Sequence, residues 1–424
     1  MKKLYSRKIL QNIKKWLLEK EIVILNGPRQ VGKTSLLKLL KKELVRQGVT
    51  EKNIFYLNLE EFNILSDLNE DPKNLLKYIV DKGNKNYFLI DEIQYLDNPS
   101  NFLKQLYDEY SEKIKIIVTG SSSLELKAVL QDSLAGRKVS FLVKPLDFKE
   151  YLQFKEFDSL KYLDKKDIPA QIKDNFDKQL EEYLIYGGMP AVVLQSDYQK
   201  KQKMLNEYIN TYINKDIRSI GKINSISSFN AVVRILASQI GNLLNISDLS
   251  NNADISRRKV ERYIDLLEYT FVLNKVIPFY KNTRKQIVKM PKVYFFDVGI
   301  RNAILGNFLS MENRQDRGEI FENFVFLELK GISDDNKIFF YRTVSGSEID
   351  FVLEIGGLTQ LVEVKYKRVK KQIDTRVLRG FNKNNKVENM FIVSLDSIKP
   401  NELVKYIDYR SIRVISSLTN SLKN

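Results

Sequence analysis

Short apolar runs alternate with longer amphipathic stretches through the first third of the chain. Apolar runs bounded by Gly, Asn or Asp are typical of strands, whereas apolar residues spaced three or four apart are typical of helices. The predicted strands are Ile22–Leu25, Ile54–Leu59, Tyr87–Ile90, Ile114–Thr119 and Val139–Val143. Helices are predicted near 35–47, 72–82 and 99–111, and over the amphipathic residues 1–20. This alternation predicts an α/β domain over residues 1–147, with a mostly parallel sheet covered on both faces.

The pattern changes after Pro145, where Lys, Glu, Tyr and Leu become frequent and Gly becomes rare. Residues 148–235 predict helices interrupted by one tight turn at Gly187–Gly188. We interpret this segment as a helical lid or linker domain.

Residues 236–282 predict a short helix from Ile246, a turn, a second helix and a strand at Phe271–Ile277. This order is that of a winged helix-turn-helix, whose second helix meets DNA. Arg257 and Arg258 stand at the start of that helix, where they would contact phosphates. The alternative is a spacer that contacts only other proteins.

The last segment, residues 283–424, combines an apolar helix from Gly318 with two strands. The strands are predicted at 347–353 and 361–365, and Gly356–Gly357 between them indicates a hairpin turn. We therefore expect a separate α/β domain at this end of the chain.

Composition limits the chemistry that the chain can perform. Its 424 residues suggest about three domains of ~150 residues. Lys and Arg total 69 against 53 Asp and Glu, and the net charge of +16 favours partners such as DNA, although it also serves solubility. The absence of Cys and His excludes disulfides, thiolate nucleophiles, Ser-His-Asp triads and H-E-x-x-H zinc sites. Catalysis must therefore depend on carboxylates, Lys, Arg, hydroxyls and hard cations such as Mg²⁺.

The sequence shows no apolar run long enough to span a membrane. Because its first residues lack an uninterrupted apolar core and a small-residue cleavage site, we expect no signal peptide. We therefore expect a cytoplasmic protein without a membrane partner. The lack of Cys agrees with that compartment.

A complete G-x-x-x-x-G-K-[ST] phosphate loop lies between the first strand and the helix that follows it. Its glycines let the backbone wrap closely around phosphates, while backbone N–H groups and the helix N-terminus point at one place. Lys33 would reach the β- and γ-phosphates of ATP, and Thr34 would bind Mg²⁺ through its hydroxyl. The expected nucleotide-binding residues are Gly27, Pro28, Arg29, Gln30, Val31, Gly32, Lys33, Thr34 and Ser35.

A second element of the nucleotide site follows the strand Tyr87–Ile90, which ends in Asp91 and Glu92. Asp91 would hold Mg²⁺, directly or through water, and Glu92 would polarise the attacking water. An acidic pair alone is more often a solvated strand end, but the phosphate loop upstream favours the catalytic interpretation.

Two further positions leave alternatives open. At the end of the strand 114–119, Ser121 or Ser122, and next Thr119, would contact the γ-phosphate or the lytic water, or a serine would cap a helix. Arg137 would act on phosphate charge in its own site or in that of a neighbouring copy, or would form a surface ion pair.

A second group of carboxylates occurs in the C-terminal segment. Strand alternation places Glu363 and Lys365 on one face, where Asp350 on the neighbouring strand and Glu322 on the helix can join them. Glu322, Asp350 and Glu363 would hold Mg²⁺, and Lys365 would stabilise charge or orient water during phosphodiester hydrolysis. The alternative is an ordinary hairpin with Glu–Lys pairing across it.

Together these motifs resemble those of bacterial and archaeal ATPases of the AAA+ superfamily, of the AAA_14 type, that carry a DUF4143 region. The similarity includes the GPRQVGKT loop at 27–34, the Walker B segment at 89–94, the LaGR motif at 134–137 and the GG-[MYF]-P turn at 186–190. Glu322, Asp350 and Glu363-Val364-Lys365 look like the core of PD-(D/E)xK nucleases, but Ile349 precedes Asp350 instead of the usual Pro-Asp pair. The resemblance implies ATP binding and hydrolysis, and a restriction-endonuclease-like C-terminal fold.

Three hypotheses follow for the function. The leading one is a Mg²⁺-dependent ATP hydrolase of the AAA+ class that acts on DNA with a fused nuclease-like domain. The second is an ATP-dependent regulatory switch whose C-terminal domain is catalytically inactive and only binds DNA or partners. The third is a chaperone-like remodeller in which the positive charge serves solubility. The sequence leaves assembly into homo-oligomers open.

Overall fold

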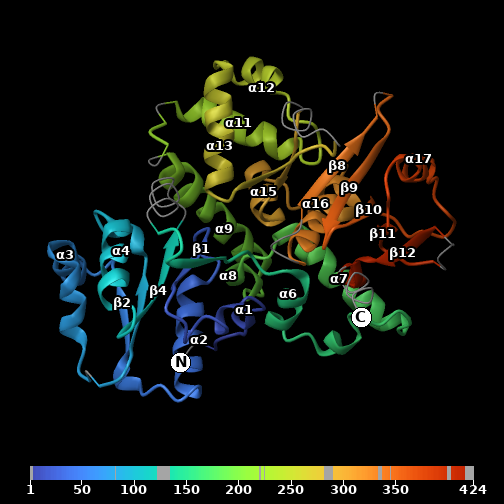
Figure 1. The fold of residues 1–424 in the computed structure, drawn as a ribbon. Coiled ribbons are helices and arrows are strands. Elements are labelled where there is room, and N and C mark those ends of the chain that lie inside the picture. The colour runs from blue at the N-terminus through green and yellow to red at the C-terminus, as the bar shows by residue number, and fades with distance from the viewer. Residues whose placement is uncertain are drawn as a thin grey trace. The chain divides into compact units, whose positions relative to one another are not determined.

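The computed structural model divides into two compact units (Figure 1). The first comprises residues 1–145 with 269–271, and the second comprises 146–268 with 272–424. The structure describes residues 3–81, 83–121, 134–218, 221–223, 225–280, 290–332, 337–343, 345–398 and 403–415, without the side chains of residues 121, 215 and 216. In these described ranges, no helix is both long and apolar enough to cross a membrane.

The sheet of the first unit has five parallel strands in the order β2-β3-β4-β1-β5. They are β1 (Ile22–Gly27), β2 (Ile54–Asn58), β3 (Asn86–Asp91), β4 (Ile114–Ser121) and β5 (Lys138–Leu142). The expected strands and their parallel pairing are therefore confirmed. Because β4 lies between β1 and β3, the carboxyl ends of these three strands meet at one edge of the sheet.

The core of this unit consists of side chains from the central strands and the helices that cover them. Ile24, Phe88, Ile90, Val118 and Leu103 have no exposed surface. Full burial of such a side chain contributes roughly 1.5–3 kcal/mol, so the apolar strand runs contribute much of the stability of the sheet.

The helices of the first unit are α1 (Leu10–Lys14), α2 (Lys33–Arg46), α3 (Phe62–Glu70) and α4 (Pro99–Tyr110), with 3₁₀ turns at Glu51–Asn53, Pro72–Tyr78 and Ile93–Tyr95. The predictions near 35–47 and 99–111 are confirmed. The prediction near 72–82 is correct for a 3₁₀ helix over Pro72–Tyr78 and wrong beyond it, where Ile79 is extended, and α3 was not predicted. Asp71 is extended, as expected for a residue before proline, and separates this 3₁₀ helix from α3.

The long helix predicted over residues 1–20 is also wrong, since α1 is only a short helix within it. Arg7 gives the reason. Its guanidinium donates from Nη1 to the carbonyl of Val31 at 2.9 Å and from Nη2 to the carbonyl of Lys144 at 2.7 Å. These contacts with distant backbone hold the segment before α1 in place and override its amphipathic pattern.

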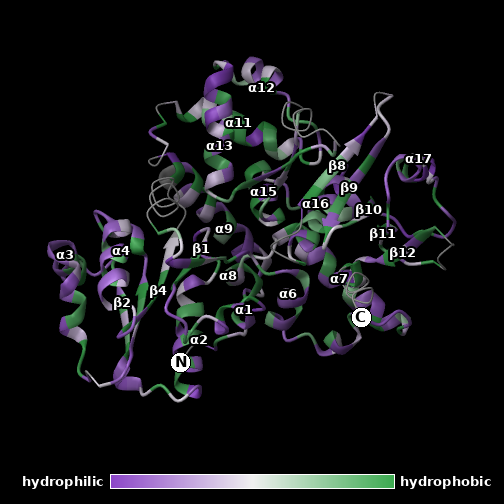
Figure 2. Ribbon diagram, in the orientation of Figure 1, coloured by the Kyte–Doolittle hydropathy of each residue, from purple (hydrophilic) through white to green (hydrophobic). Residues whose placement is uncertain are grey.

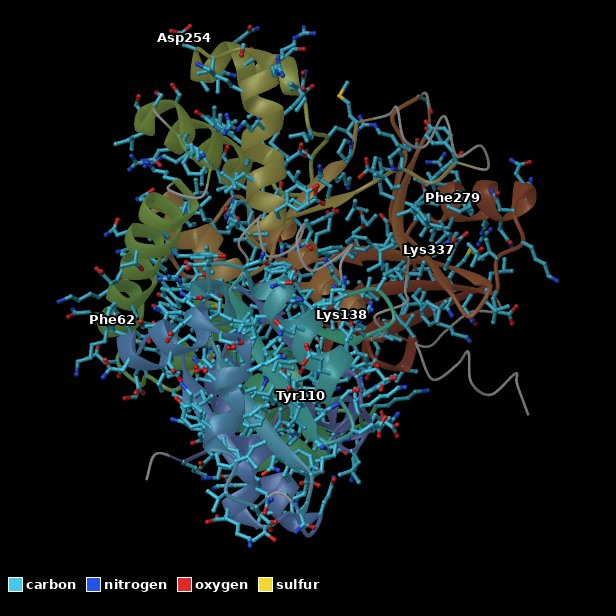
Figure 3. All side chains as sticks on the ribbon, turned by 60° about the vertical axis from the view of Figure 1, so that its left-hand side comes forward. Phe62, Tyr110, Lys138, Asp254, Phe279 and Lys337 are labelled. Carbon is cyan, nitrogen blue, oxygen red and sulfur yellow. The ribbon has the colours of Figure 1, made fainter. Side chains whose placement is uncertain are left out.

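The second unit begins with a series of helices. Its first helical elements are α6 (Phe148–Phe154), α7 (Ala170–Tyr186), α8 (Pro190–Val193), α9 (Tyr198–Tyr208) and α11 (Ile226–Ser238), with a 3₁₀ helix at Asp158–Tyr162 and a π-helix at Ile209–Ile217. α12 (Ile246–Ala253) and α13 (Arg257–Tyr269) follow. Asp254 ends α12 in a left-handed conformation, and Figure 3 shows it at the outer end of the pair.

Two short strands complete this region. β6 (Leu273–Val276) pairs antiparallel with β7 (Lys292–Phe295). The helix, turn, helix and strand predicted over 236–282 are thus present at the expected places.

The C-terminal sheet is mixed and has the order β12-β11-β10-β9-β8. Its strands are β8 (Lys337–Arg342), β9 (Glu348–Ile355), β10 (Leu358–Lys365), β11 (Asn389–Ser394) and β12 (Val404–Asp408). β9 and β10 pair antiparallel around Gly356–Gly357, which confirms the predicted hairpin. β10, β11 and β12 pair in parallel.

Helices and 3₁₀ turns accompany this sheet. They are α15 (Val298–Leu305), α16 (Arg317–Lys330) and α17 (Arg376–Asn384), with 3₁₀ turns at Met311–Asn313 and Tyr409–Ser411. Figure 2 shows α17 largely in the hydrophilic colour, and this helix buries only Leu378 and Phe381. α16 buries residues all along its length, as expected of a core helix.

The tight turn at Gly187–Gly188 is fixed by Asp297, the N-cap residue of α15. The Asp297 carboxylate accepts hydrogen bonds from the N–H of Gly188 at 2.7 Å and of Ile300 at 2.9 Å. A Cβ on Gly187 would lie 2.1 Å from Asp297 Oδ1, and its φ of +74° also favours glycine. Burial raises the pKa of Asp297 to about 6, although the backbone donors act in the opposite direction. The close packing of α7 against α15 therefore requires these glycines.

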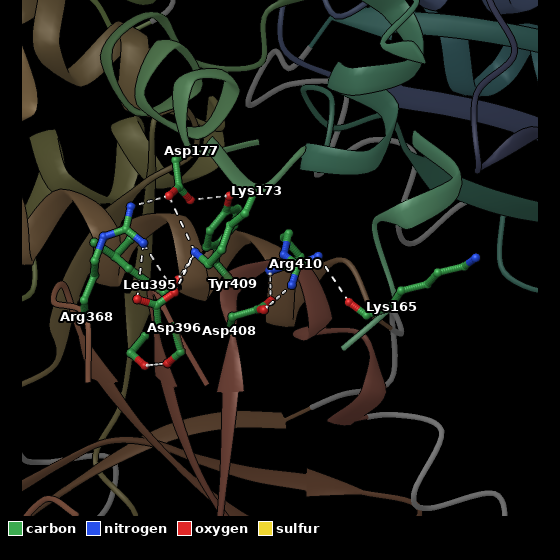
Figure 4. Close-up of polar contacts among 10 residues, drawn as sticks. Lys165, Lys173, Asp177, Arg368, Leu395, Asp396, Asp408, Tyr409 and Arg410 are labelled. Carbon is green, nitrogen blue, oxygen red and sulfur yellow. Dashed lines mark hydrogen bonds and ion pairs between the residues drawn. The ribbon is translucent and has the colours of Figure 1, made fainter. Parts of the chain in front are cut away.

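Ion pairs attach α7 to the ends of the C-terminal strands (Figure 4). Asp177 on α7 accepts hydrogen bonds from Arg368 Nη2 at 2.6 Å and from the Tyr409 hydroxyl at 2.8 Å. Lys173, one turn earlier, lies 2.7 Å from Asp396 Oδ1. These contacts join the segment predicted as a lid to the C-terminal sheet within the second unit.

Candidate active site

The phosphate loop connects β1 to α2 and depends on two glycines. Gly32 has a φ of +95°, a conformation that side chains with a Cβ rarely adopt. A Cβ on Gly27 would lie 2.3 Å from the carbonyl oxygen of Val143. Because α2 begins at Lys33, its first backbone N–H groups point into the loop. The loop therefore presents the donors that a phosphate group needs.

Lys33 is the buried cation of this loop. Its side chain is 4% exposed, and Nζ donates to the carbonyls of Gly27 at 3.0 Å and of Pro28 at 2.9 Å. Burial lowers the pKa of Lys33 to about 8, against the opposing effect of the Glu92 and Asp91 carboxylates. Its positive charge is thus costly in this state, and an anion that reached Nζ would reduce that cost.

Asp91 lies at the end of β3 and accepts hydrogen bonds from three hydroxyl groups. Thr34 Oγ1 donates to Oδ2 at 2.7 Å, the Tyr56 hydroxyl donates to Oδ2 at 2.9 Å, and the Thr119 hydroxyl donates to Oδ1. These bonds connect α2, β2 and β4 to one carboxylate. The Thr34 hydroxyl and the Asp91 carboxylate are oxygen ligands of the kind that Mg²⁺ prefers, so the observed residues fit that ion.

Glu92 follows Asp91 in a left-handed conformation, with a φ of +59°. Its backbone N–H donates to Thr119 Oγ1 at 2.9 Å, and its carboxylate accepts from the side-chain amide of Gln94. A positive φ is uncommon in residues other than glycine, and such strain is often found at functional sites. The two carboxylates thus have different partners, since Asp91 accepts from three hydroxyls and Glu92 from an amide.

The tertiary structure adds two residues that the sequence analysis missed. Tyr56 lies on β2, where an aromatic residue is typical of any strand, and burial together with the nearby Asp91 raises its pKa. Arg7 supports the loop through the carbonyl of Val31. Nothing in the local sequence distinguishes either residue, because each contact joins distant parts of the chain.

Among the polar groups predicted at the end of β4, Thr119 is the one that the structure places against Asp91. The side chain of Ser121 and the whole of Ser122 lie outside the described residues. Their predicted contact with the γ-phosphate therefore stays a prediction.

Arg137 does not lie at this site. Its carbonyl accepts a hydrogen bond from the N–H of Ile22 at 2.9 Å, so it lies beside the start of β1. Because β1 and β5 are parallel, Arg137 lies at the amino ends of these strands, whereas the phosphate loop lies at their carboxyl ends. Its guanidinium instead pairs with Asp108, with Nε 2.6 Å from Oδ1. The surface ion pair is therefore observed, the position of Arg137 does not support a role in its own site, and action in a neighbouring copy stays a prediction.

The C-terminal group predicted from the sequence is also brought together. Glu322, Asp350 and Lys365 line one cavity of about 480 Å³ in the second unit. Lys365 Nζ donates to Glu363 Oε1 at 2.6 Å, and the N–H of Val364 donates to Asp350 Oδ2 at 2.7 Å. The predicted grouping of these side chains is correct.

The predicted metal role of this group is not supported, because the described part of the chain contains no cluster of three acidic residues arranged to hold a metal ion. The expected ligands were Glu322, Asp350 and Glu363. Lys292 explains the difference, since its Nζ lies 3.1 Å from Glu322 Oε1 and also pairs with Glu348. Burial, together with the charges of Glu322 and Glu363, raises the pKa of Asp350 well above its usual value. The metal site predicted here therefore stays a prediction that the observed contacts do not favour.

A parallel sheet whose first strand enters a phosphate loop, with an acidic pair at the end of β3, defines a P-loop nucleotide hydrolase fold. Residues 19–152 match the family model described as "AAA domain", which supports an AAA-type ATPase. Residues 317–408 match "Domain of unknown function (DUF4143)", as the resemblance implied. Residues 177–310 match "Domain of unknown function (DUF8612)".

Relatives at the sequence level come from bacteria and archaea. An uncharacterized protein from Haemophilus influenzae is 29% identical over 354 residues, which cover 81% of this chain and 82% of the relative. An uncharacterized protein from Methanocaldococcus jannaschii is 27% identical over 395 residues, which cover 91% of this chain and 84% of the relative.

Solved structures show weaker similarity. The Walker-type ATPase of Pyrococcus abyssi has a TM-score of 0.46 and 16% identity, with 71% of this chain and 95% of that chain covered. The Aeropyrum pernix ORC1 protein in complex with DNA has a TM-score of 0.30 and 12% identity, with 71% and 93% covered. Neither similarity is close enough to bear on the function of this chain.

Proposed function

We propose that this chain is a Mg²⁺-dependent ATP hydrolase of the AAA class that works as a regulatory switch on DNA. The observation that carries the proposal is the network at the strand ends, where Asp91 joins the Thr34 and Thr119 hydroxyls beside the buried ammonium of Lys33. We also propose the division of labour expected from the sequence, with ATPase (1–147), helical lid (148–235), winged helix-turn-helix (236–282) and C-terminal (283–424) segments.

ATP would enter with its phosphates in the loop between β1 and α2. The backbone N–H groups at the start of α2 would donate to phosphate oxygens, and Lys33 Nζ would exchange the carbonyls of Gly27 and Pro28 for the β- and γ-phosphates. Mg²⁺, held by Thr34 and Asp91, would neutralise charge on those phosphates.

Glu92 would accept a proton from the attacking water at its carboxylate. Thr119 supports this role, because its hydroxyl accepts from the N–H of Glu92 and donates to Asp91. The same threonine therefore fixes the metal-binding acid and the base relative to each other.

The pKa of Lys33 leads to a pH-dependent prediction for ATP binding. The free protein has a pKa of about 8 at this ammonium, and bound phosphates would raise it. The complex then binds more protons than the free protein above about pH 8, so affinity should fall as pH rises, approaching about tenfold per pH unit. Calorimetry between roughly pH 7 and pH 9.5 at fixed Mg²⁺ measures this. An affinity that does not change over this range would contradict the contact between Lys33 and phosphate.

The C-terminal segment fits the regulatory hypothesis better than the nuclease hypothesis. Its carboxylates are engaged by Lys292 and Lys365 of the chain itself. The proposed role of this segment is therefore to bind DNA or a partner without cleaving DNA.

DNA contact is proposed for the first turn of α13. Arg257, Arg258 and Lys259 are exposed there. Further along the helix, Glu261 and Asp265 are also exposed and would repel phosphates. The basic first turn is thus the part of α13 that suits a DNA backbone.

The double substitution Arg257→Ala and Arg258→Ala tests this proposal. It should weaken DNA binding regardless of sequence, and the slope of log affinity against log salt should become shallower by roughly 2, one unit for each phosphate that the protein no longer neutralises. Fluorescence anisotropy over a salt series measures both effects, with Arg46→Ala, an exposed position at the end of α2, as the control. Unchanged binding in the double variant would favour a spacer role, and salt-insensitive binding would favour the remodeller.

A further inference from the structure

We propose that Lys292 takes the place of a divalent metal ion in the C-terminal carboxylate group, so that this group is closed to Mg²⁺ and Mn²⁺. The proposal does not depend on the ATP site. It concerns the cavity lined by Glu322, Glu348 and Asp350 in the second unit.

The position of the Lys292 ammonium is the first observation. Lys292 is the first residue of β7 and is 2% exposed. Its Nζ lies 3.1 Å from Glu322 Oε1 on α16 and also pairs with the carboxylate of Glu348 on β9. One cation thus bridges a helix and a strand from within the cavity, as a metal ion between the same carboxylates would.

The second observation is that one oxygen of each neighbouring carboxylate already has a donor. The Tyr294 hydroxyl donates to Glu322 Oε1 at 2.6 Å, in addition to Lys292. Asp350 Oδ2 accepts from the N–H of Val364, and Glu363 Oε1 accepts from Lys365. Because Mg²⁺ needs several oxygen ligands in near-ideal geometry, it would compete with these donors for the same carboxylates.

Electrostatics gives the physical reason for a built-in cation. Carboxylates that are close together and partly buried repel one another unless a positive charge lies among them. Lys292 supplies that charge permanently, because it is covalently attached and sits on a strand of the core. A dication cannot share the position with the ammonium, since like charges at contact distance repel strongly in a buried site. The group is therefore a structural ion cluster of the folded chain.

Lys292→Met tests the proposal, because it removes the ammonium and keeps an unbranched apolar side chain. In EDTA this variant should melt below the wild type, since the carboxylates lose their counter-charge. Mn²⁺ should then raise its melting temperature by roughly 4 °C or more, as expected for a ligand that binds the folded state. The wild type, and the double variant Lys292→Met with Asp350→Asn, should gain no such stabilisation.

The matched control is Lys367→Met, which removes an exposed lysine from the lining of the same cavity. It should behave like the wild type with and without Mn²⁺. All these melts are done without nucleotide, so any weak binding of Mn²⁺ at the phosphate loop is common to every variant, and a failure of the ATP proposal would not affect the comparison.

Two results would overturn the proposal. One is a folded Lys292→Met protein that Mn²⁺ stabilises no more than the wild type. The other needs only chains that keep Lys292, and so remains available if Lys292→Met does not fold. Wild-type protein is incubated with supercoiled plasmid and Mn²⁺, and nicking that disappears in Asp350→Asn would show that a metal enters the group despite Lys292. Intact plasmid under these conditions is the expected result.

Discussion

Lys33→Ala is expected to abolish ATP hydrolysis and to weaken ATP binding by roughly 10²–10⁴-fold. The ammonium would make two charge-assisted hydrogen bonds to the β- and γ-phosphates, and each contributes ~1.5–3 kcal/mol. Their loss corresponds to this range of affinity, since ~1.4 kcal/mol is tenfold. Calorimetry measures the binding, and phosphate release in the presence of Mg²⁺ measures the hydrolysis.

The control for this variant is Lys38→Ala, at an exposed lysine on the same helix α2. It should leave binding and hydrolysis unchanged. Because Lys33 also holds the carbonyls of Gly27 and Pro28, thermal melting must show that Lys33→Ala is folded. A folded Lys33→Ala protein that hydrolyses ATP at the wild-type rate would falsify the assignment of this site.

Glu92→Gln is expected to separate chemistry from binding. The amide has nearly the same shape as the carboxylate but cannot accept a proton, so hydrolysis should fall by roughly 10²–10⁴-fold, the usual contribution of a general base. The amide oxygen can still accept the hydrogen bond that Gln94 donates to Glu92. ATP affinity should therefore stay within about threefold of the wild type, a difference of less than ~1 kcal/mol. Single-turnover hydrolysis and calorimetry on the same preparation measure the two quantities.

Glu112→Gln, at an exposed position of the first unit, is the control for the change of charge. It should have no effect on either quantity. If Glu92→Gln retained the wild-type rate, Glu92 would not be the base. If it lost ATP binding as strongly as Lys33→Ala, Glu92 would serve to hold the nucleotide.

The strand predictions succeeded because their signal is local. Residues such as Ile24, Phe88 and Val118 are apolar neighbours in runs that end at turn residues, and each run is buried in the sheet. The phosphate loop is recognisable for the same reason, since the glycines that adopt positive φ, the lysine and the helix start all lie within one short segment. The C-terminal hairpin at Gly356–Gly357 is a further local signal.

The failures share the opposite property. The pattern over residues 1–20 is amphipathic, but Arg7 binds backbone carbonyls far along the chain and most of the expected helix does not form. Arg137 stands in a recognisable motif, yet the parallel pairing of β5 with β1 places it at the amino ends of these strands. Lys292 has no motif at all, and only the fold brings its ammonium to Glu322 and Glu348.

The sequence alone determined the parallel sheet, the phosphate loop, and the identity of Lys33, Thr34, Asp91 and Glu92 as the residues to test, because each depends on neighbours a few positions away. Tertiary structure alone decided which groups surround them. It placed the Tyr56 and Thr119 hydroxyls on Asp91. It also put a lysine where the C-terminal carboxylates were expected to hold a metal ion. The physical reason is that the charge at a buried site is set by every side chain within a few ångströms, and the chain brings those side chains together only when it folds.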